Sequence, residues 1–236
     1  QVSFRTETND EMIQTLDEKG RATQIENKTQ KTLTQFLYDD LKKIYEVISG
    51  AFHQWVEYGR DHEANTPDDH TFQVAFLSAE GKQIVQQLDP KDRVTQIENK
   101  TDGTLISFLY GDQKEEYEIH QGTTVQYLTY GPDHEPGKEP NDDLLFQVDF
   151  VTEEKERLSQ RLNPDGRVRE IENKTQGTLT QFLYDDARKL YEVISGSVRQ
   201  LIHYGLDNLA ASPDDRVSQV SFRTETNDEM IQTLDE

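Results

Sequence analysis

Short segments in which one face of side chains recurs with a period of two follow one another along the whole chain. From Val198 the residues Gln200, Ile202 and Tyr204 continue one such face, as expected for a β-strand. The segments are rich in Val, Ile, Phe, Tyr and Thr, and clusters of Asp, Asn, Gly and Pro separate them. Apolar residues at the three- and four-residue spacing of a helix are not evident. The pattern predicts an all-β protein.

Turn residues divide these segments into hairpins. Asn163-Pro164-Asp165-Gly166 is a turn sequence, and Gly177 and Gly196 supply the positive φ angles of tight loops. Three antiparallel hairpins are expected in each stretch of about 70 residues. In the last complete stretch the expected strand pairs are 147–150 with 158–162, 167–171 with 178–184, and 190–194 with 198–204.

The chain contains an internal repeat. Glu-Asn-Lys-Thr occurs at residues 26–29, 98–101 and 172–175, at offsets of 72 and 74 residues, and Phe-Leu-Tyr keeps the same offsets at 36–38, 108–110 and 182–184. Tyr-Gly recurs likewise at 58–59, 130–131 and 204–205. We predict repeat unit 1 at residues 1–71, repeat unit 2 at 72–145 and repeat unit 3 at 146–217.

A second level of repetition links the two ends. Residues 219–236 are identical to residues 1–18, so residues 218–236 are expected to start a fourth unit. A natural array of 218-residue blocks explains this identity, and so do an engineered overlap that closes a ring and an arbitrary cut through a periodic fibre. Gln1 begins directly in a strand-like segment without the pattern of a signal peptide, so we expect an interior piece of a longer chain.

Units that repeat in series predict a β-spiral or solenoid-like array of antiparallel hairpins, in which each unit buries surface against the next. A closed β-propeller, with the duplicated ends as a clasp, is the alternative.

One repeated arrangement resembles a known family. Gly166-Arg167-Val168 is followed by Ile171, Gly177-Thr178 and Phe182-Leu183-Tyr184-Asp185, and Gly20-Arg21 is likewise followed by Tyr38-Asp39. This order resembles the YD repeats of Rhs and teneurin-type proteins, over about the middle third of each unit. Unit 2 departs from it, with Asp92-Arg93 and Tyr110-Gly111-Asp112. The resemblance implies hairpins wound into a β-spiral on a cell surface or around a toxin.

Composition excludes several partners and chemistries. The 25 basic and 46 acidic residues give a net charge of −21, which disfavours nucleic acid and anionic membrane surfaces as partners. The absence of cysteine excludes disulfides, thiolate metal sites and cysteine nucleophiles. No run is long and apolar enough to cross a bilayer, so membrane insertion is not expected.

Few residues suggest a site. Asn27, Asn99 and Asn173 satisfy the N-glycosylation sequon, although Asn and Thr also suit hairpin loops. Paired acidic residues in the longer loops are candidates for calcium, since this ion prefers several oxygen ligands, although such loops are also common without an ion. These candidates are Asp68, Asp69, Asp142, Asp143, Asp214 and Asp215. No catalytic or phosphate-binding motif occurs, and we predict no enzyme activity and no required cofactor.

These observations favour an acidic structural module of a long extracellular or cell-surface filament, whose partners are neighbouring repeat units and, through self-assembly, other copies. A glycan- or protein-binding adhesin is one alternative. A segment of an Rhs-like shell around a toxin is another.

Overall fold

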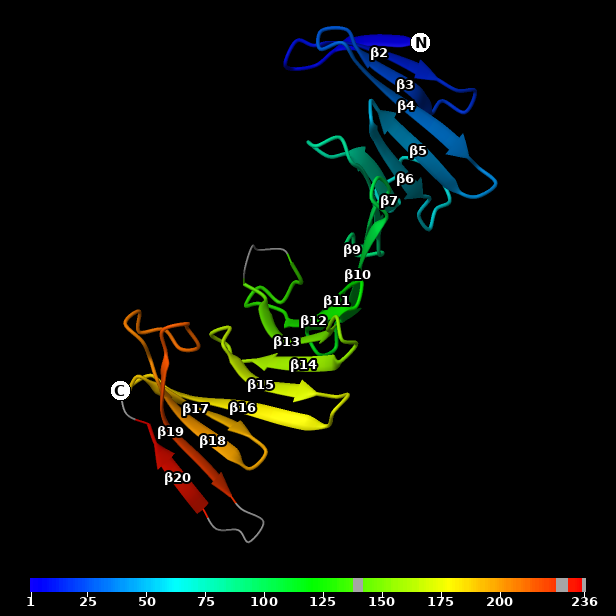
Figure 1. The fold of residues 1–236 in the computed structure, drawn as a ribbon. Helices are drawn as coiled ribbons and strands as arrows, with labels where there is room; N and C mark the ends of the chain where they lie inside the picture. Colours follow the sequence, from blue (N-terminus) through cyan, green and yellow to red (C-terminus); the bar gives the residue numbers. More distant parts are fainter. Residues whose placement is uncertain (138–141, 224–228, 235–236) are drawn as a thin grey trace. The chain divides into compact units, whose positions relative to one another are not determined.

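All regular secondary structure in the computed structural model is β, within the residues that the structure describes, 1–137, 142–223 and 229–234 (Figure 1). The all-β prediction is confirmed. No helix that could cross a bilayer occurs in this part of the chain. The strands are β1 (Val2–Arg5), β2 (Glu11–Leu16), β3 (Ala22–Asn27), β4 (Thr32–Asp39), β5 (Ile44–Ser49), β6 (Phe52–Glu57), β7 (His70–Leu77), β8 (Gln83–Leu88), β9 (Val94–Asn99), β10 (Thr104–Gly111), β11 (Glu116–Gln121), β12 (Thr124–Thr129), β13 (Leu144–Val151), β14 (Arg157–Leu162), β15 (Val168–Asn173), β16 (Thr178–Asp185), β17 (Leu190–Ser195), β18 (Val198–His203), β19 (Arg216–Arg223) and β20 (Glu229–Thr233).

The predicted hairpins of the last complete repeat are confirmed. Strand β13 pairs antiparallel with β14, β15 with β16, and β17 with β18. Gly166, Gly177 and Gly196 adopt positive φ angles of 80°, 68° and 58° in the turns that the sequence marks. Local turn chemistry therefore accounts for the hairpins.

Strands of successive hairpins also pair with one another, so that the hairpins join into continuous antiparallel meanders. The chain forms two compact units, residues 1–108 and 109–236. In the first, β1 to β9 pair each with the next, and β9 pairs with β10. In the second, β11 to β20 do the same.

The closed β-propeller alternative is wrong for this structure. Propeller blades are separate sheets of four strands. Here the pairing runs on without a break past every fourth strand within each unit, and the sheet does not close. The winding of a β-spiral stays a prediction.

The strands recur at the same offsets as the sequence. Strands β3, β9 and β15 all end at the Asn of the Glu-Asn-Lys-Thr motif. The predicted repeat boundaries fall inside strands β7, β13 and β19. The fourth unit lies partly outside the described residues, which omit 224–228 and 235–236. The division into repeat units itself stays a prediction.

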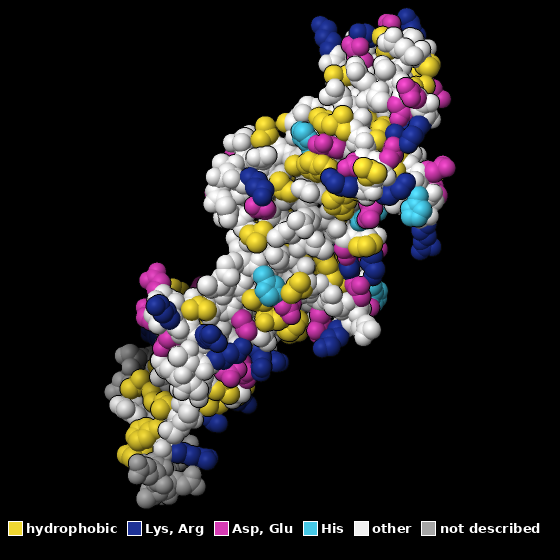
Figure 2. Space-filling view, turned by 90° about the vertical axis from the view of Figure 1, so that its right-hand side faces the viewer, with side chains coloured by type: hydrophobic (Ala, Val, Ile, Leu, Met, Phe, Trp, Pro, Cys, Tyr) yellow, Lys and Arg dark blue, Asp and Glu magenta, His cyan; other side chains and the backbone are white. Residues whose placement is uncertain are grey.

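The sheet has a thin core. Element contacts among the described strands join neighbours in the sequence, so no second layer covers the sheet within either unit. Among the residues that the structure describes, the buried hydrophobic ones are Tyr45, Val56, Tyr58, Ala75, Tyr117, Tyr191 and Ile202. Many other apolar side chains stay partly exposed, and Figure 2 shows them between charged side chains on the face in view. Tyrosines therefore supply much of the burial.

Candidate functional site

Three tyrosines from successive strands stack against one another in each repeat. Tyr38 in β4 pairs with Tyr45 in β5, and Tyr58 follows β6, so strand alternation brings all three rings to one face. The ring centroids of Tyr38 and Tyr45 are 5.6 Å apart, and those of Tyr45 and Tyr58 are 5.9 Å apart. The same contacts join Tyr110, Tyr117 and Tyr130, and Tyr184, Tyr191 and Tyr204.

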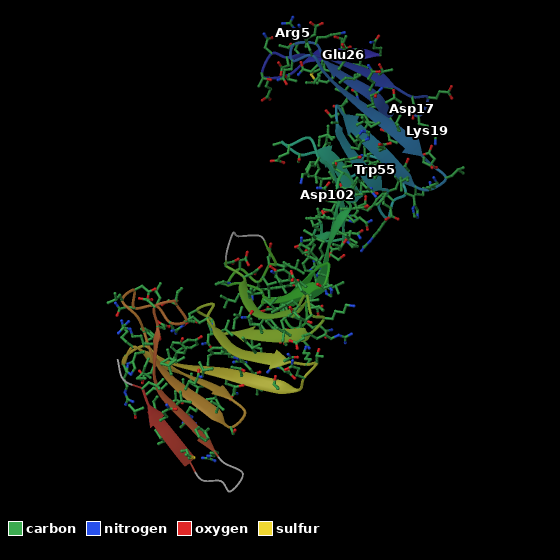
Figure 3. All side chains as sticks on the ribbon, in the orientation of Figure 1. Arg5, Asp17, Lys19, Glu26, Trp55 and Asp102 are labelled. Atoms are coloured by element: carbon green, nitrogen blue, oxygen red, sulfur yellow. The ribbon has the colours of Figure 1, made fainter. Side chains whose placement is uncertain are left out.

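An arginine directly before β3 covers this stack. The Arg21 guanidinium lies 4.0 Å from the Tyr38 ring centroid and donates to Asp40 Oδ1 at 2.7 Å. Asp40 also accepts from the Tyr58 hydroxyl at 2.9 Å, and Asp17 accepts from Arg21 Nε at 2.8 Å. Figure 3 shows Asp17 and Lys19 at the tip of the β2–β3 turn, and Lys19 Nζ lies 2.7 Å from Asp40. We call this arrangement the tyrosine–aspartate node.

The third repeat contains the same node with one replacement. Arg167 lies 4.4 Å from the Tyr184 ring centroid and donates to Asp186, which accepts from the Tyr204 hydroxyl at 2.7 Å. Asn163 stands where repeat 1 has Asp17, and the second carboxylate comes instead from Asp165, 2.6 Å from Arg167. Arg21 and Arg167 therefore each have two acidic partners.

In the second repeat the arginine of the node lies in the unit of residues 1–108, and the aspartate and tyrosine lie in the unit of residues 109–236. Each part is retained. Arg93 Nη2 lies 2.6 Å from Asp89. The Tyr130 hydroxyl donates to Asp112 at 3.0 Å. Asp92, which replaces the glycine of the Gly-Arg pair, adopts the same left-handed region with φ 61°. The departure from the Gly-Arg pattern therefore leaves the turn intact.

The nodes connect the residues that carry the YD resemblance, but the acid that the arginine binds is a different one. In the nodes of repeats 1 and 3 the carboxylate belongs to the residue after Tyr-Asp, Asp40 or Asp186. The preceding Asp39 and Asp185 instead accept from backbone N–H groups of the following turn. The sequence does contain a signal for this acid. In all three repeats an Asp stands two residues after the tyrosine, at Asp40, Asp112 and Asp186.

Electrostatics hold the node in one ionisation state. Hydrogen bonds from Arg167 and then from Tyr204 lower the pKa of Asp186 to about 2. Burial, reinforced by the Asp186 carboxylate, raises the pKa of Tyr204 to about 12. Burial, reinforced by the Asp40 carboxylate, likewise raises the pKa of Tyr58 to about 12. The carboxylate is therefore charged and the phenol neutral over the whole physiological range.

These pKa values predict alkaline unfolding. A tyrosine whose folded pKa is about 12 stabilises the fold below the unfolded value of about 10, and that contribution is lost as the pH rises through about 12. We expect circular dichroism and tyrosinate absorbance to change together in this window. The Tyr204→Phe variant should lose part of that pH dependence. Gradual ionisation near pH 10 with an unchanged fold would contradict the prediction.

The long loops after the Tyr-Gly pairs fold around their paired acids. Asp69 accepts from the backbone N–H groups of Gly59 at 3.0 Å and Asn65 at 2.7 Å. Asp68 accepts from the Arg60 N–H at 2.6 Å. In the second repeat, Asp143 accepts from Gly131 N–H, Gly137 N–H and the Tyr117 hydroxyl. The paired acids thus act as acceptors that close the loops.

Some of the predicted calcium ligands lie close together. Carboxylate oxygens of Asp61, Asp68 and Asp69 lie within 4.8 Å of one another, as do those of Asp207, Asp214 and Asp215. A hydroxyl lies among the first three, because Thr66 Oγ1 is 2.8 Å from Asp68, 3.2 Å from Asp69 and 3.3 Å from Asp61. Several oxygens on a loop are what calcium requires, but hydroxyl and backbone donors already serve these oxygens. Calcium binding stays a prediction at these loops.

The three predicted sequons begin at the last residues of β3, β9 and β15 and continue into the following turns, and their side chains bond to the protein itself. Asn99 is buried, its Oδ1 accepts from the Thr101 N–H at 3.0 Å, and its Nδ2 donates to Asp102 at 2.9 Å. Asn27 is also buried and accepts from the Gln30 N–H. Asn173 accepts from Thr175 N–H and donates to Glu156. Glycosylation stays a prediction, and it would have to displace these contacts.

The sequon threonines tie one hairpin to the next. Thr29 Oγ1 accepts from the Glu11 N–H at 2.9 Å, Thr101 from the Gln83 N–H at 3.0 Å, and Thr175 from the Arg157 N–H at 2.8 Å. Each bond satisfies the first N–H of a strand in the preceding hairpin. The Asn-x-Thr pattern therefore has a structural explanation in all three repeats.

We expect Thr175→Val to lower the free energy of unfolding by about 1–2 kcal/mol, because the Arg157 N–H loses its acceptor. Urea denaturation measures the loss. The control is Thr178→Val, at an exposed position in β16 where a β-branched apolar residue is tolerated. Equal stability of the two variants would contradict the structural role of the sequon threonine.

Comparisons with known proteins do not identify a family. No family model matches the chain, and no curated protein matches it. A solved structure that is similar in part is Kluyveromyces lactis Hsv2, described as "complete loop 6CD", at 10% identity and a TM-score of 0.17, over 84% of this chain and 72% of that one. A TM-score this low carries no argument about fold or function.

Proposed function

We propose that this chain is a structural repeat module of a long extracellular or cell-surface filament. The observation that supports it is the position of the repeat boundaries. Residues 71/72, 145/146 and 217/218 all fall within strands that pair on both sides, β7, β13 and β19. Main-chain hydrogen bonds therefore cross from each repeat into the next, as a load-bearing array requires.

The tyrosine–aspartate nodes add side-chain cross-links to this array. Arg21 and Tyr38 lie at the open end of the β3–β4 hairpin, and the Tyr58 hydroxyl, which follows the next hairpin, bonds to the same Asp40 as Arg21. A repeating stack of rings and charged hydrogen bonds stiffens a sheet that has no second layer. The strong negative charge favours repulsion between filaments rather than lateral clumping.

Dependence of each repeat on its neighbours tests the proposal. A fragment of residues 72–145 begins and ends inside strands, so we expect it to unfold at a much lower urea concentration than the 236-residue chain. A fragment with the full stability of the chain, with no tendency to dock onto its neighbours, would refute the structural proposal. Antibody labelling of intact, unpermeabilised source cells tests the extracellular location.

One pocket favours a second candidate function, the binding of a glycan. It measures about 530 Å³, and Tyr127 and Phe146 line it with ring centroids 6.3 Å apart. Glu116 and Glu118 lie in the same lining, and Leu109 is 56% exposed beside them. Aromatic rings with carboxylate acceptors suit the apolar faces and hydroxyls of a sugar.

A glycan array tests this candidate. A hit that Tyr127→Ala abolishes and Leu183→Ala preserves would support an adhesin, since Leu183 is the exposed third-repeat counterpart of Leu109. The equivalent positions hold Trp55 and Phe72 at the first repeat boundary and Leu201 and Ser218 at the third, so aromatic pairs occur at the first two boundaries and not at the third. If the array shows no binding, the adhesin function is rejected and the structural function is the one that stands.

A further inference from the structure

The duplicated sequence forms the same hairpin at both ends of the chain. Strands β1 and β2 pair with Val2 opposite Gln14 and Phe4 opposite Met12. Strands β19 and β20 pair with Val220 opposite Gln232 and Phe222 opposite Met230. Each pair is displaced by 218 residues from its counterpart, so the register is identical. The two hairpins are interchangeable in sequence and in backbone pairing.

The two copies differ in the neighbours they bind. Strand β2 pairs on its second side with β3, placing Gln14 opposite Ile25. Strand β19 pairs on its second side with β18, placing Val220 opposite Gln200. Among the described residues β20 pairs with β19 alone, at the edge of its unit in Figure 1. Its outer edge therefore carries the same residues that β2 uses to hold β3.

We propose that β20 of one copy of this chain pairs with β3 of a second copy in the register of β2, displacing that copy's β1–β2 hairpin. The sheet then continues from β18, β19 and β20 of one copy into β3 of the next. The occupant of the β3 edge is thus a second copy of this chain. This inference rests on the proposed structural function and specifies how modules join.

The exchange conserves the strand pairing. One β2–β3 interface is replaced by a β20–β3 interface with the same residues. Strand β20 is presented by β19, which six residue pairs anchor to β18. The β1 strand is exposed at all four residues, and a hairpin alone is marginal in water, so its release costs little. The local hairpin has an effective concentration on the order of millimolar, so exchange grows with protein concentration.

Disulfide trapping in the full-length chain tests the register. The chain has no cysteine. The hydrogen bond from Lys28 N to Glu11 O makes Glu11 and Lys28 a hydrogen-bonded pair, and alternation makes Gln14 and Ile25 a non-hydrogen-bonded pair, which suits a disulfide. Gln232→Cys mixed with Ile25→Cys should give a disulfide-linked heterodimer. Gln232→Cys mixed with Glu26→Cys should give none, because Glu26 points to the opposite face.

The duplication offers a matched pair of variants with opposite effects. Phe4→Asp weakens the hairpin that must leave, so in the trapping experiment it should increase the heterodimer several-fold when placed in the Ile25→Cys chain. Phe222→Asp weakens the hairpin that presents β20, so it should reduce the heterodimer several-fold when placed in the Gln232→Cys chain. A general increase in aggregation would move both in the same direction.

Three results of these experiments would overturn the inference. No heterodimer at high protein concentration, equal trapping with Glu26→Cys, or parallel effects of the two phenylalanine variants would each exclude register-specific exchange. The structural function is judged separately by the stability of the 72–145 fragment. Filaments that form without the in-register disulfide would leave that function standing and reject β20–β3 pairing.

Discussion

Replacing Tyr117 by Ala is expected to lower the free energy of unfolding by about 3–5 kcal/mol. Tyr117 is 6% exposed, and its ring lies 5.9 Å from the rings of both Tyr110 and Tyr130. Its hydroxyl donates to Asp143 at 2.8 Å, so the substitution removes the centre of the stack and one contact that holds the long loop.

Tyr117→Phe separates the ring from the hydroxyl. The ring stack remains, and Asp143 keeps the N–H donors of Gly131 and Gly137, so we expect a loss of only about 1 kcal/mol. Urea denaturation followed by far-ultraviolet circular dichroism measures both variants. A loss below about 1 kcal/mol for Tyr117→Ala would show that the tyrosine stack is not the core of the repeat.

The sequence predicts the hairpins well because their information is local. Turn residues such as Gly166 and Gly177 require positive φ, and period-two alternation sets the faces of the adjoining strands. Pairing between successive hairpins is not encoded in any short segment. It depends on the apolar face being shared along the sheet, which the repeat implied but did not assign to particular strands.

The node was visible in the sequence only in part. The sequence marks Gly-Arg and Tyr-Asp as a pair, but the contact from Arg21 to Asp40 spans 19 residues and depends on strand register and twist. The sequons show the reverse case, in which a motif that predicts a modification also has a structural role in a turn. Asn99 and Thr101 look like a modification signal, whereas the structure places them in a turn where both side chains serve as hydrogen-bond acceptors for the backbone.

Repetition of the same short motifs therefore reports two different constraints. Asn-x-Thr repeats because one hairpin must be fastened to the next, and Tyr-Gly repeats because a ring and a loop must meet at one point. A substitution at the glycine of Tyr-Gly tests the second constraint most directly.

Gly59→Ala is expected to lower the free energy of unfolding by about 2–4 kcal/mol. A Cβ at residue 59 would lie 2.6 Å from the backbone oxygen of Asp68 and still closer to its carboxyl group, so the loop backbone must move. That movement would break the bond from Gly59 N–H to Asp69.

The matched control is Gly50→Ala, where φ is 61° and nothing lies within 4 Å of the added Cβ. Its cost is limited to the left-handed backbone, about 1–2 kcal/mol. Thermal and urea unfolding of the two variants should rank Gly59→Ala as the more damaging, because steric overlap with the loop backbone exceeds the cost of an unfavourable φ. The reverse order would mean that the Tyr-Gly pairs repeat for a reason other than close packing of the loop.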